Sequence, residues 1–324
     1  MDIQLVVQDS IGGKIYDISE LVKNISWSTE VAGQPGKLTF DYVQTPDVVI
    51  NEGSVVYFKV NGQNVFYGYA FIRKQSKDGV MSITAYDQMR YLKNKDTYAV
   101  SDMTASQVFE RICKDFKLNA RVVNPSSYVL SARVHDNKSL FEIIDWGITE
   151  TMAYSSTWYM IRDNFGTLEF IDLNTLKTDL FIGDESLLTG YDFESSIDEN
   201  TYNQIKIVSE NTQTKKREVI VRDSSTISRW GLLQYFETAS ENANAAQLED
   251  KAKKLLSLKN TPTKKLRINC LGDLKVYAGC GIVFGVSELS NEGFAENKYF
   301  VVTSCTHTFS NNMHTMTLDL QVSV

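Results

Sequence analysis

Three histidines and four cysteines are the residues in this sequence best suited to metal binding. Cys305 and His307 lie two residues apart in a segment that reads as a β-strand, so their side chains share one face. His314, on the strand expected next, would complete a set of three metal ligands. No fourth ligand can be named, and polar residues on an exposed β-hairpin are the simpler interpretation. The other histidine, His135, has no such neighbours, and we predict no metal site.

Pairs of carboxylates are the second kind of chemistry to consider, because a glycosidase needs one acid with a raised pKa and one ionised partner. Acidic residues are densest at Asp192, Glu194, Asp198 and Glu199, where the polar surroundings favour a solvated loop. The sequence holds no G-x-S-x-G, H-E-x-x-H, phosphate-loop or dinucleotide-binding glycine motif. We therefore expect no catalytic residue, no cofactor and no enzymatic activity.

Basic residues gather in two small groups, a run at 215–217 and a second group at Lys264, Lys265 and Arg267. The run is most simply a solvated hairpin tip, and contact with an acidic partner surface is the functional alternative. The whole chain has 33 Lys and Arg against 40 Asp and Glu, a formal net charge of −7. This balance argues against a protein that binds nucleic acid through its phosphates, and we expect no sequence-specific nucleic acid binding.

The composition places the chain among ordinary globular proteins. Hydrophobic residues make up 43% and charged residues 23% of the positions, which are ordinary globular values. The length of 324 residues predicts about two folded domains. There is no run of about 18 apolar residues, so we expect no membrane insertion. Because Asp2 stands where the basic region of a signal peptide would begin, we expect the N-terminus not to be a signal peptide. The four cysteines form no C-x-x-C pair, which indicates reduced thiols in a protein made in the cytoplasm.

The first 95 residues predict a β-rich domain. Gly12-Gly13 and Asn61-Gly62 are turn signals between apolar segments. We expect strands at 3–7, 14–18, 37–43, 54–60, 65–74 and 80–86. Short strands separated by turn residues are typical of a small barrel or sandwich and not of a βαβ unit.

Residues 96–178 predict a helix–helix–hairpin module. Apolar residues recur every three or four positions from Val108 to Phe116, and Thr104 with Gln107 can form a capping box. A second helix is expected at 139–152, beginning with the box formed by Ser139 and Glu142. Strands at 157–163 and 167–173 then form a hairpin across a loop that contains Gly166.

Residues 179–324 predict a second β-rich domain, interrupted by a helical excursion at about 239–261. Strands are expected at 203–209 and 217–223, followed by a helix at 241–259 that Pro262 ends. The last 60 residues read as four further strands. The segment 279–321 also repeats the pattern of 53–87: a glycine, a strand, a polar turn, an aromatic-rich strand, a polar hairpin and an alternating strand. This internal similarity predicts a duplicated domain.

The order of the motifs along the chain resembles that of a known family, the baseplate hub proteins of contractile phage tails and related tailocins (the XkdQ-like and late-control-D-like group). Ser228-Arg229-Trp230-Gly231 before the third helix, and Gly272-Asp273 with Gly279 after it, match best. The other segments that carry the resemblance are T-A-S-Q-V-F-E-R-I-C-K-D-F-K-L-N (104–119), S-L-F-E-I-I-D-W (139–146), A-A-Q-L-E-D-K-A-K-K-L-L (245–256) and L-G-D-L-K-V-Y-A-G-C-G-I-V-F (271–284).

The resemblance implies a fold that is mainly β with α+β insertions: two related small β-barrel domains, the helix–helix–hairpin module and one additional long helix. It also implies a structural hub that forms a homotrimeric ring and adapts the six-fold tail tube to the three-fold spike. Implied partners are the tail tube or a tube-initiator protein, the central spike, and LysM-containing and wedge baseplate proteins. The alternatives are a cell-wall-degrading enzyme and a carbohydrate-binding tail component, which exposed aromatic platforms would favour.

Overall fold

The computed structural model describes residues 1–31, 33–209, 217–239, 245–294 and 298–322. The chain forms two compact units: the large unit contains Met1–Tyr191 with Arg267–Val324, and the small unit contains Asp192–Leu266. Strands dominate the large unit and the described chain as a whole, so the predicted mainly β class with helical insertions is confirmed. Within the described ranges, no helix is both long enough and apolar enough to span a lipid bilayer.

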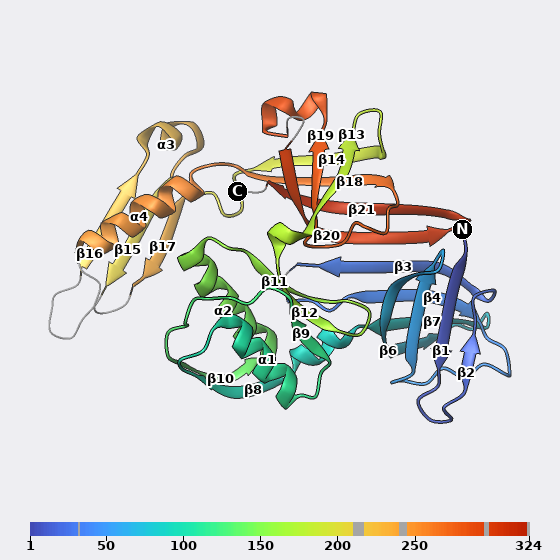
Figure 1. Ribbon diagram of the computed structural model, residues 1–324. Coiled ribbons are helices and arrows are strands. Elements are labelled where there is room, and N and C mark those ends of the chain that lie inside the picture. The colour runs from blue at the N-terminus through green and yellow to red at the C-terminus, as the bar shows by residue number, and fades with distance from the viewer. Residues whose placement is uncertain (32, 210–216, 240–244, 295–297, 323–324) are drawn as a thin grey trace. The chain divides into compact units, whose positions relative to one another are not determined.

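The first β region runs from β1 to β7 and begins at the blue end of the chain in Figure 1. They are β1 (Ile3–Gln8), β2 (Ile15–Asp17), β3 (Val22–Glu30), β4 (Lys37–Val43), β5 (Val55–Val60), β6 (Gln63–Gln75) and β7 (Val80–Tyr86). Buried residues alternate with partly exposed ones along β5 and β7, which is the period of a strand with one face against a core. Asn61 and Gly62 both have positive φ, as the predicted two-residue hairpin turn between β5 and β6 requires.

The α+β module follows, with two short 3-10 helices at its ends. Its elements are η1 (Gln88–Lys93), β8 (Lys95–Val100), α1 (Ala105–Asp115), β9 (Ala120–Val122), β10 (Arg133–Ser139), α2 (Leu140–Ser155), β11 (Tyr159–Asp163), β12 (Leu168–Asp172) and η2 (Leu173–Leu176). Both predicted capping boxes are present, at Thr104 and at Ser139. The two helices share one apolar core that includes the fully buried Phe109, Leu140 and Phe170.

The second β region returns the chain to the same sheet. Its elements are β13 (Lys177–Gly183), β14 (Leu188–Ser196), β18 (Thr263–Leu271), β19 (Gly281–Gly285), η3 (Ser287–Glu292), β20 (Lys298–Ser310) and β21 (Met313–Val322). The backbone hydrogen bonds follow one path, β14-β18-β21-β20-β3-β4-β7-β6-β5-β1-β2, and β13 joins through β19 to β20. The two small barrels therefore stay a prediction, since one continuous sheet runs through both regions.

The two β regions repeat one strand order. The first reads β1-β5-β6-β7-β4-β3 across the sheet, and the second reads β13-β19-β20-β21-β18-β14. Numbered along the chain within each region, both are 1-4-5-6-3-2, apart from the additional β2. The fifth strand has 13 residues in each region and a register shift in its middle, at Ala70/Ile72 in β6 and at Val302/Ser304 in β20. The predicted internal similarity is therefore seen in the connections of the strands.

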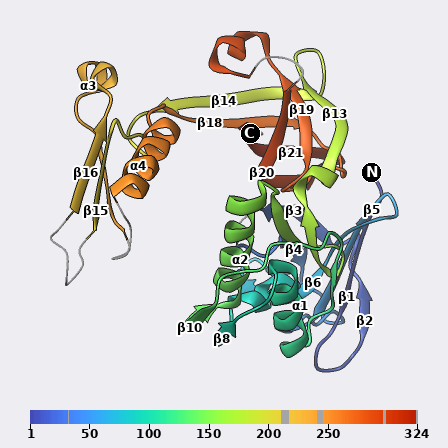
Figure 2. The same ribbon diagram turned by 60° about the vertical axis from the view of Figure 1, so that its left-hand side comes forward.

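The β regions are joined by an antiparallel ladder between β3 and β20, which lie beside each other in Figures 1 and 2. The register runs from Ser304 opposite Glu30 to Phe309 opposite Ile25. Phe309 belongs to the apolar core of the first region, where its ring lies 5.2 Å from that of Phe58. The second half of β20 therefore completes the first region's core.

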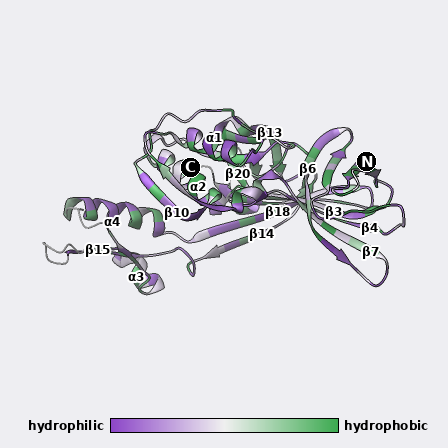
Figure 3. Cartoon of the chain, turned by 90° about the horizontal axis from the view of Figure 1, so that it is seen from below, coloured by the Kyte–Doolittle hydropathy of each residue, from purple (hydrophilic) through white to green (hydrophobic). Residues whose placement is uncertain are grey.

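The small unit is a three-stranded sheet covered on one face by a helix. Its elements are β15 (Gln204–Ser209), β16 (Arg217–Arg222), α3 (Ser224–Trp230), β17 (Gln234–Thr238) and α4 (Ala245–Lys259), and its strand order is β16-β15-β17. Purple and green bands alternate along α4 in Figure 3, as expected for an amphipathic helix. Its buried Leu248 and Ala252 pack against Ile205 and Ile207.

The small unit contains more residues than the helical excursion that the sequence predicts at about 239–261. Residues 179–238 were expected to belong to the second β-rich domain, with only about 239–261 excluded from it. The structure instead groups Asp192–Leu266 into one compact unit. The reason is that β15, β16 and β17 pair with one another and pack under α4, which gives this segment its own apolar core.

Candidate functional site

The structure brings together the three residues that formed the best metal constellation in the sequence. The sulfur of Cys305 lies 3.1 Å from Nε2 of His307, and Nδ1 of His307 lies 2.8 Å from Nε2 of His314. Cys305 and His307 are completely buried, and the ring of Trp27 stacks on that of His307 with 5.0 Å between centroids. The predicted hairpin is present. It is not exposed as expected, because β3 pairs with this half of β20.

The hydrogen bonds of the histidine pair leave no electron pair on His307 for a metal. Nε2 of His307 lies 2.8 Å from the carbonyl oxygen of Val276, so this nitrogen carries the proton. Its Nδ1 therefore accepts a hydrogen bond from Nε2 of His314. Burial lowers the pKa of His307 to about 4 and raises the pKa of the Cys305 thiol well above its usual range. Both groups are thus neutral, and the described residues hold no group of three or more His, Cys, Asp or Glu side chains, this set included, that could bind a metal ion.

The predicted acidic cluster is exposed and spread along the chain. Asp192 and Glu194 lie on β14 and not on a loop, whereas Asp198 and Glu199 follow it. Lys265 on β18 lies 3.1 Å from Glu199 and 3.9 Å from Glu194. All four carboxylates are exposed, and Glu194 and Glu199 pair with a lysine, so the cluster lacks the apolar enclosure of a catalytic acid.

The predicted basic groups are divided in the same way. Lys215 and Lys216 lie outside the described residues, and Arg217 begins β16. Arg267 on β18 makes a two-pronged ion pair with Asp319, with nitrogen–oxygen distances of 2.8 and 3.1 Å. That arginine therefore supports the sheet and does not add to a basic surface.

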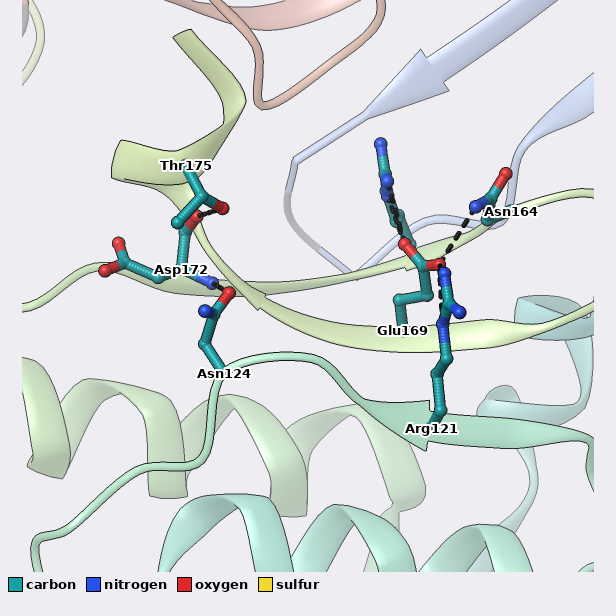
Figure 4. A network of polar contacts seen from close by, with 7 residues as sticks. Arg121, Asn124, Asn164, Glu169, Asp172 and Thr175 are labelled. Atoms are coloured by element: carbon teal, nitrogen blue, oxygen red, sulfur yellow. Dashed lines mark hydrogen bonds and ion pairs between the residues drawn. The ribbon is translucent and has the colours of Figure 1, made fainter.

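The polar cluster that sequence reasoning missed is centred on Glu169 of β12, shown in Figure 4. The carboxylate is fully buried and accepts hydrogen bonds from Arg121, from Nε of Arg162 (2.8 Å) and from Asn164 (2.9 Å). Burial alone would raise the pKa of Glu169, but these donors outweigh it, so the pKa lies below its ordinary value. Asn124, Asp172 and Thr175 form a neighbouring set of bonds that holds the end of β12.

Two further acids, the buried Asp87 before η1 and the half-buried Asp163 at the end of β11, lie near each other. Asp87 accepts hydrogen bonds from the backbone N–H groups of Gly36 (2.8 Å) and Met89 (2.9 Å). Asp163 accepts from the N–H groups of Gln88 (3.3 Å) and Gly166 (2.6 Å). Burial and the charge of Asp163 raise the pKa of Asp87 well above its usual range, and burial raises the pKa of Asp163 to about 6.

We call these two acids with Glu169 and Arg162 the polar junction, because they connect three parts of the large unit. Asp87 follows β7, Asp163 and Arg162 lie on β11, and the guanidinium of Arg162 lies 4.8 Å from the ring of Tyr277 in the second β region. A cavity of about 180 Å³ lies beside the junction. Since both oxygens of each aspartate accept backbone N–H groups, the geometry supports fixing the chain and not activating a substrate.

The polar junction joins residues far apart in the sequence, so local patterns carry little sign of it. Gln88 and Asp163 lie 75 residues apart, and Arg121 and Glu169 lie 48 apart. The available signal was a charged residue, Glu169, at a buried-strand position in T-L-E-F-I-D-L, where an apolar residue is usual.

Comparison with known proteins gives two relatives in Bacillus subtilis. The chain is 30% identical over 274 residues to the uncharacterized protein YqbQ and 28% identical over 280 residues to the phage-like element PBSX protein XkdQ. Each match covers 84% of this chain and 82% of the relative. The predicted resemblance to XkdQ-like proteins is therefore confirmed.

Similar solved structures share the fold at low identity. The 43 kDa tail protein of prophage MuSo2 from Shewanella oneidensis has a TM-score of 0.72 at 12% identity, over 98% of both chains. The c3393 protein of E. coli has a TM-score of 0.54 at 10% identity, over 94% of this chain and 74% of that one. It is described as a type VI secretion component that resembles the T4 tail proteins gp27 and gp5.

These four descriptions contain no enzyme activity, and two of them name phage tail proteins. The fold is therefore one that phage tail proteins share. The YQBQ-like family model matches residues 25–321, nearly the whole chain. With this match and the 30% identity to YqbQ, the chain belongs to the YQBQ-like family.

Proposed function

We propose that this chain is the structural baseplate hub of a contractile phage tail or tailocin. Three copies form a ring that adapts the six-fold tail tube to the three-fold spike. The observation that carries the proposal is the repeated strand order 1-4-5-6-3-2 of the two β regions. A chain with two similar domains presents six similar positions in a ring of three, which matches a six-fold surface above and leaves three-fold symmetry below.

The domain division belongs to the same proposal. Residues 1–95 supply the first tube-like domain, 96–178 the α+β module, and 179–324 the second tube-like domain with the small unit as its excursion. Contacts of the α+β module support a rigid connection within the large unit, because Arg162 lies over Tyr277 of the second β region and the ring of Phe165 lies 5.9 Å from that of Tyr67 in the first. A rigid chain suits a ring that transmits force from the tube to the spike.

The proposed partners are the tail tube or a tube-initiator protein, the central spike, and LysM-containing and wedge baseplate proteins. The hub is made in the host cytoplasm and incorporated there into the tail. The family membership and the phage-element name of the relative XkdQ support this assignment. The acidic balance of the chain suits a lumen through which DNA or protein passes without binding.

Light scattering on the chain co-expressed with its spike protein tests the proposal. We expect a hub mass of three times 36.7 kDa in the complex. A monomer in isolation is compatible, since the spike can template the ring. A monomer or dimer in the presence of the spike would contradict the proposal.

The alternative of a cell-wall-degrading enzyme is tested separately. Purified protein is expected not to clear peptidoglycan in a turbidity assay or a zymogram, because Asp87 and Asp163 of the polar junction accept backbone hydrogen bonds. Clear lysis that one Asp→Asn or Glu→Gln substitution abolishes would support the enzyme. Retention on cell-wall glycan without lysis would support the carbohydrate-binding alternative.

A further inference from the structure

The ladder between β3 and β20 shows how one β region adds a strand to the other. The second strand of the first region, β3, lies along β20 of the second region from Ser304 to Phe309. On the same edge of β20, the preceding residues up to Val301 pair with β19. The first half of β20 therefore pairs with β19 of its own region, and the second half pairs with β3 of the other region.

The hydrogen bonds at the start of the fourth strand align the two fifth strands residue by residue. The N–H of Gly53 donates to the carbonyl oxygen of Ala70, and the N–H of Ala70 donates to the carbonyl oxygen of Ser54. In the second region Gly279 donates to Val302, and Val302 donates to Cys280. Ala70 thus corresponds to Val302, and Ile72–Gln75 of β6 corresponds to residues 304–307 of β20, where β3 binds.

Among the described residues, this part of β6 has no ladder partner on its second edge, although the side chains of Arg73 and Gln75 donate to the carbonyl of Ile50 (3.1 Å) and to Gln44 (3.0 Å). Residues Ile72–Gln75 pair with β7 on one side, whereas the β5 ladder on the other side ends at Tyr69. All four residues are exposed. An exposed strand edge with unused backbone groups is a site for strand addition.

The strand that corresponds to β3 is β14. Each is the second strand of its region, each has nine residues, and β14 lies at the end of the sheet path. β14 carries the exposed Asp192 and Glu194, and the edge of β6 carries the exposed Lys74. Beside them Arg73 pairs with Glu52 at 3.6 Å, and Glu194 lies 3.9 Å from Lys265. Acidic and basic side chains are thus placed where two copies of the chain would bring them together.

We propose that β14 of one chain adds as an antiparallel strand to the Ile72–Gln75 edge of β6 in the next copy. This contact repeats between chains the β3–β20 ladder within the chain. Each chain then offers one donor strand and one acceptor edge, which is the head-to-tail arrangement that closes a ring. The inference rests on the proposed ring and names its contact, and it gives a role to the acidic cluster on β14.

Crosslinking tests the contact directly. Two variants with one added cysteine each, Lys74→Cys and Glu194→Cys, are differently tagged, mixed, assembled with the spike protein and treated with a short bis-maleimide. The four native cysteines are buried, which limits background. We expect crosslinked dimers that carry both tags. The matched control replaces Glu194→Cys by Asp250→Cys on α4, whose side chain is 65% exposed against 63% for Glu194.

Charge reversal gives a second measurement. Lys74→Glu is expected to lower the association constant of the ring by about tenfold through repulsion from Asp192 and Glu194. Adding Glu194→Lys in the same chain is expected to restore most of it. Ring formation without the 74–194 crosslink, or without this rescue, would overturn the strand contact and leave the proposed hub intact. Absence of any ring with the spike would overturn both.

Discussion

The two β regions share their strand order but differ in the connection between the second and third strands. In the first region residues 31–36 join β3 to β4, whereas in the second region 197–262 lie between β14 and β18. The small unit is therefore placed where the first region has a short turn. Turn tips tolerate insertions because few contacts are lost there. The comparison shows that a duplicated domain can gain a folded unit without changing its strand order.

The regions also differ in the direction of their first strand. β1 is antiparallel to β5, whereas β13 is parallel to β19. β1 follows the chain start, but β13 comes directly after η2 of the module, so the chain enters the sheet from another end. The position beside the fourth strand is the same in both regions although the strand direction is reversed. Position in the sheet is therefore the more constant property.

The largest expected effect comes from removing the residue that one β region contributes to the other's core. Phe309→Ala is expected to lower the free energy of unfolding by about 3–5 kcal/mol, the range for a buried phenylalanine. The Phe309 side chain is 2% exposed and packs in the first region. Urea denaturation followed by circular dichroism measures the change. Phe236→Ala is the control, because Phe236 is 56% exposed and should cost less than about 1 kcal/mol.

The same experiment tests whether the two β regions unfold together. A shared sheet and a shared core predict one transition for both, shifted as a whole by Phe309→Ala. Two separate transitions would show that the regions unfold independently, if Phe309→Ala shifts only the transition of the second β region, to which β20 belongs. In that case the β3–β20 ladder would be a weak contact and a poor guide to contacts between chains.

Corresponding glycines sharpen the comparison. Gly53 and Gly279 make the same hydrogen bonds with φ of 82° and 95°, where an L-residue is strained by about 1–2 kcal/mol. A Cβ at 279 would lie 2.1 Å from the sulfur of Met160, whereas one at 53 meets nothing closer than 3.7 Å. We expect Gly279→Ala to cost about 2–4 kcal/mol and Gly53→Ala about 1–2 kcal/mol in urea denaturation.

The matched control for both glycines is Gly190→Ala, because Gly190 has no positive φ and its Cβ would have no neighbour within 4 Å. A change below about 0.5 kcal/mol is expected there. Equal costs at 53 and 279 would show that backbone strain dominates and that the Met160 contact relaxes.

The position of the buried His307 is occupied in the first region by Gln75, a side chain that does not take up a proton. With its pKa lowered to about 4, folded His307 stays neutral while the unfolded chain takes up a proton below pH 6.5. Stability therefore falls as pH falls from 6.5 to 4, by about 3 kcal/mol in total. His307→Gln is expected to remove most of this slope in thermal melts taken at a series of pH values. Parallel slopes for the variant and the wild type would contradict the assignment.

Much of the fold could be predicted because its signals are local. The Asn61-Gly62 turn and the boxes at Thr104 and Ser139 were all found in the structure. By contrast β3 was missed, because V-K-N-I-S-W-S-T-E is rich in polar residues and Asn24 has a positive φ that breaks the alternation. What makes β3 a strand is its pairing with β20, nearly 280 residues later in the chain.

The candidate site was predicted only in part for the same reason. Cys305, His307 and His314 were expected together because their spacing suits one hairpin, but their burial depends on the distant β3. Asp87 and Asp163 carry no local pattern. Their shifted pKa values come from burial between segments that only the folded sheet brings into contact.

The smallest expected effect tests the insertion itself. Replacing residues 197–262 by a short turn like that at 31–36 should leave the large unit folded, since the small unit has its own apolar core around Ile205 and Leu248. The free energy of unfolding of the large unit is expected to change by less than about 2 kcal/mol, the scale of a loop-closure term. Circular dichroism and urea denaturation of the shortened chain measure this change, and a mixture with the full chain and the spike shows whether it still enters the ring. A shortened chain that aggregates or unfolds would mean that residues 197–262 are part of the second β region's folding unit. A folded shortened chain that fails to enter the ring would instead assign the small unit to assembly.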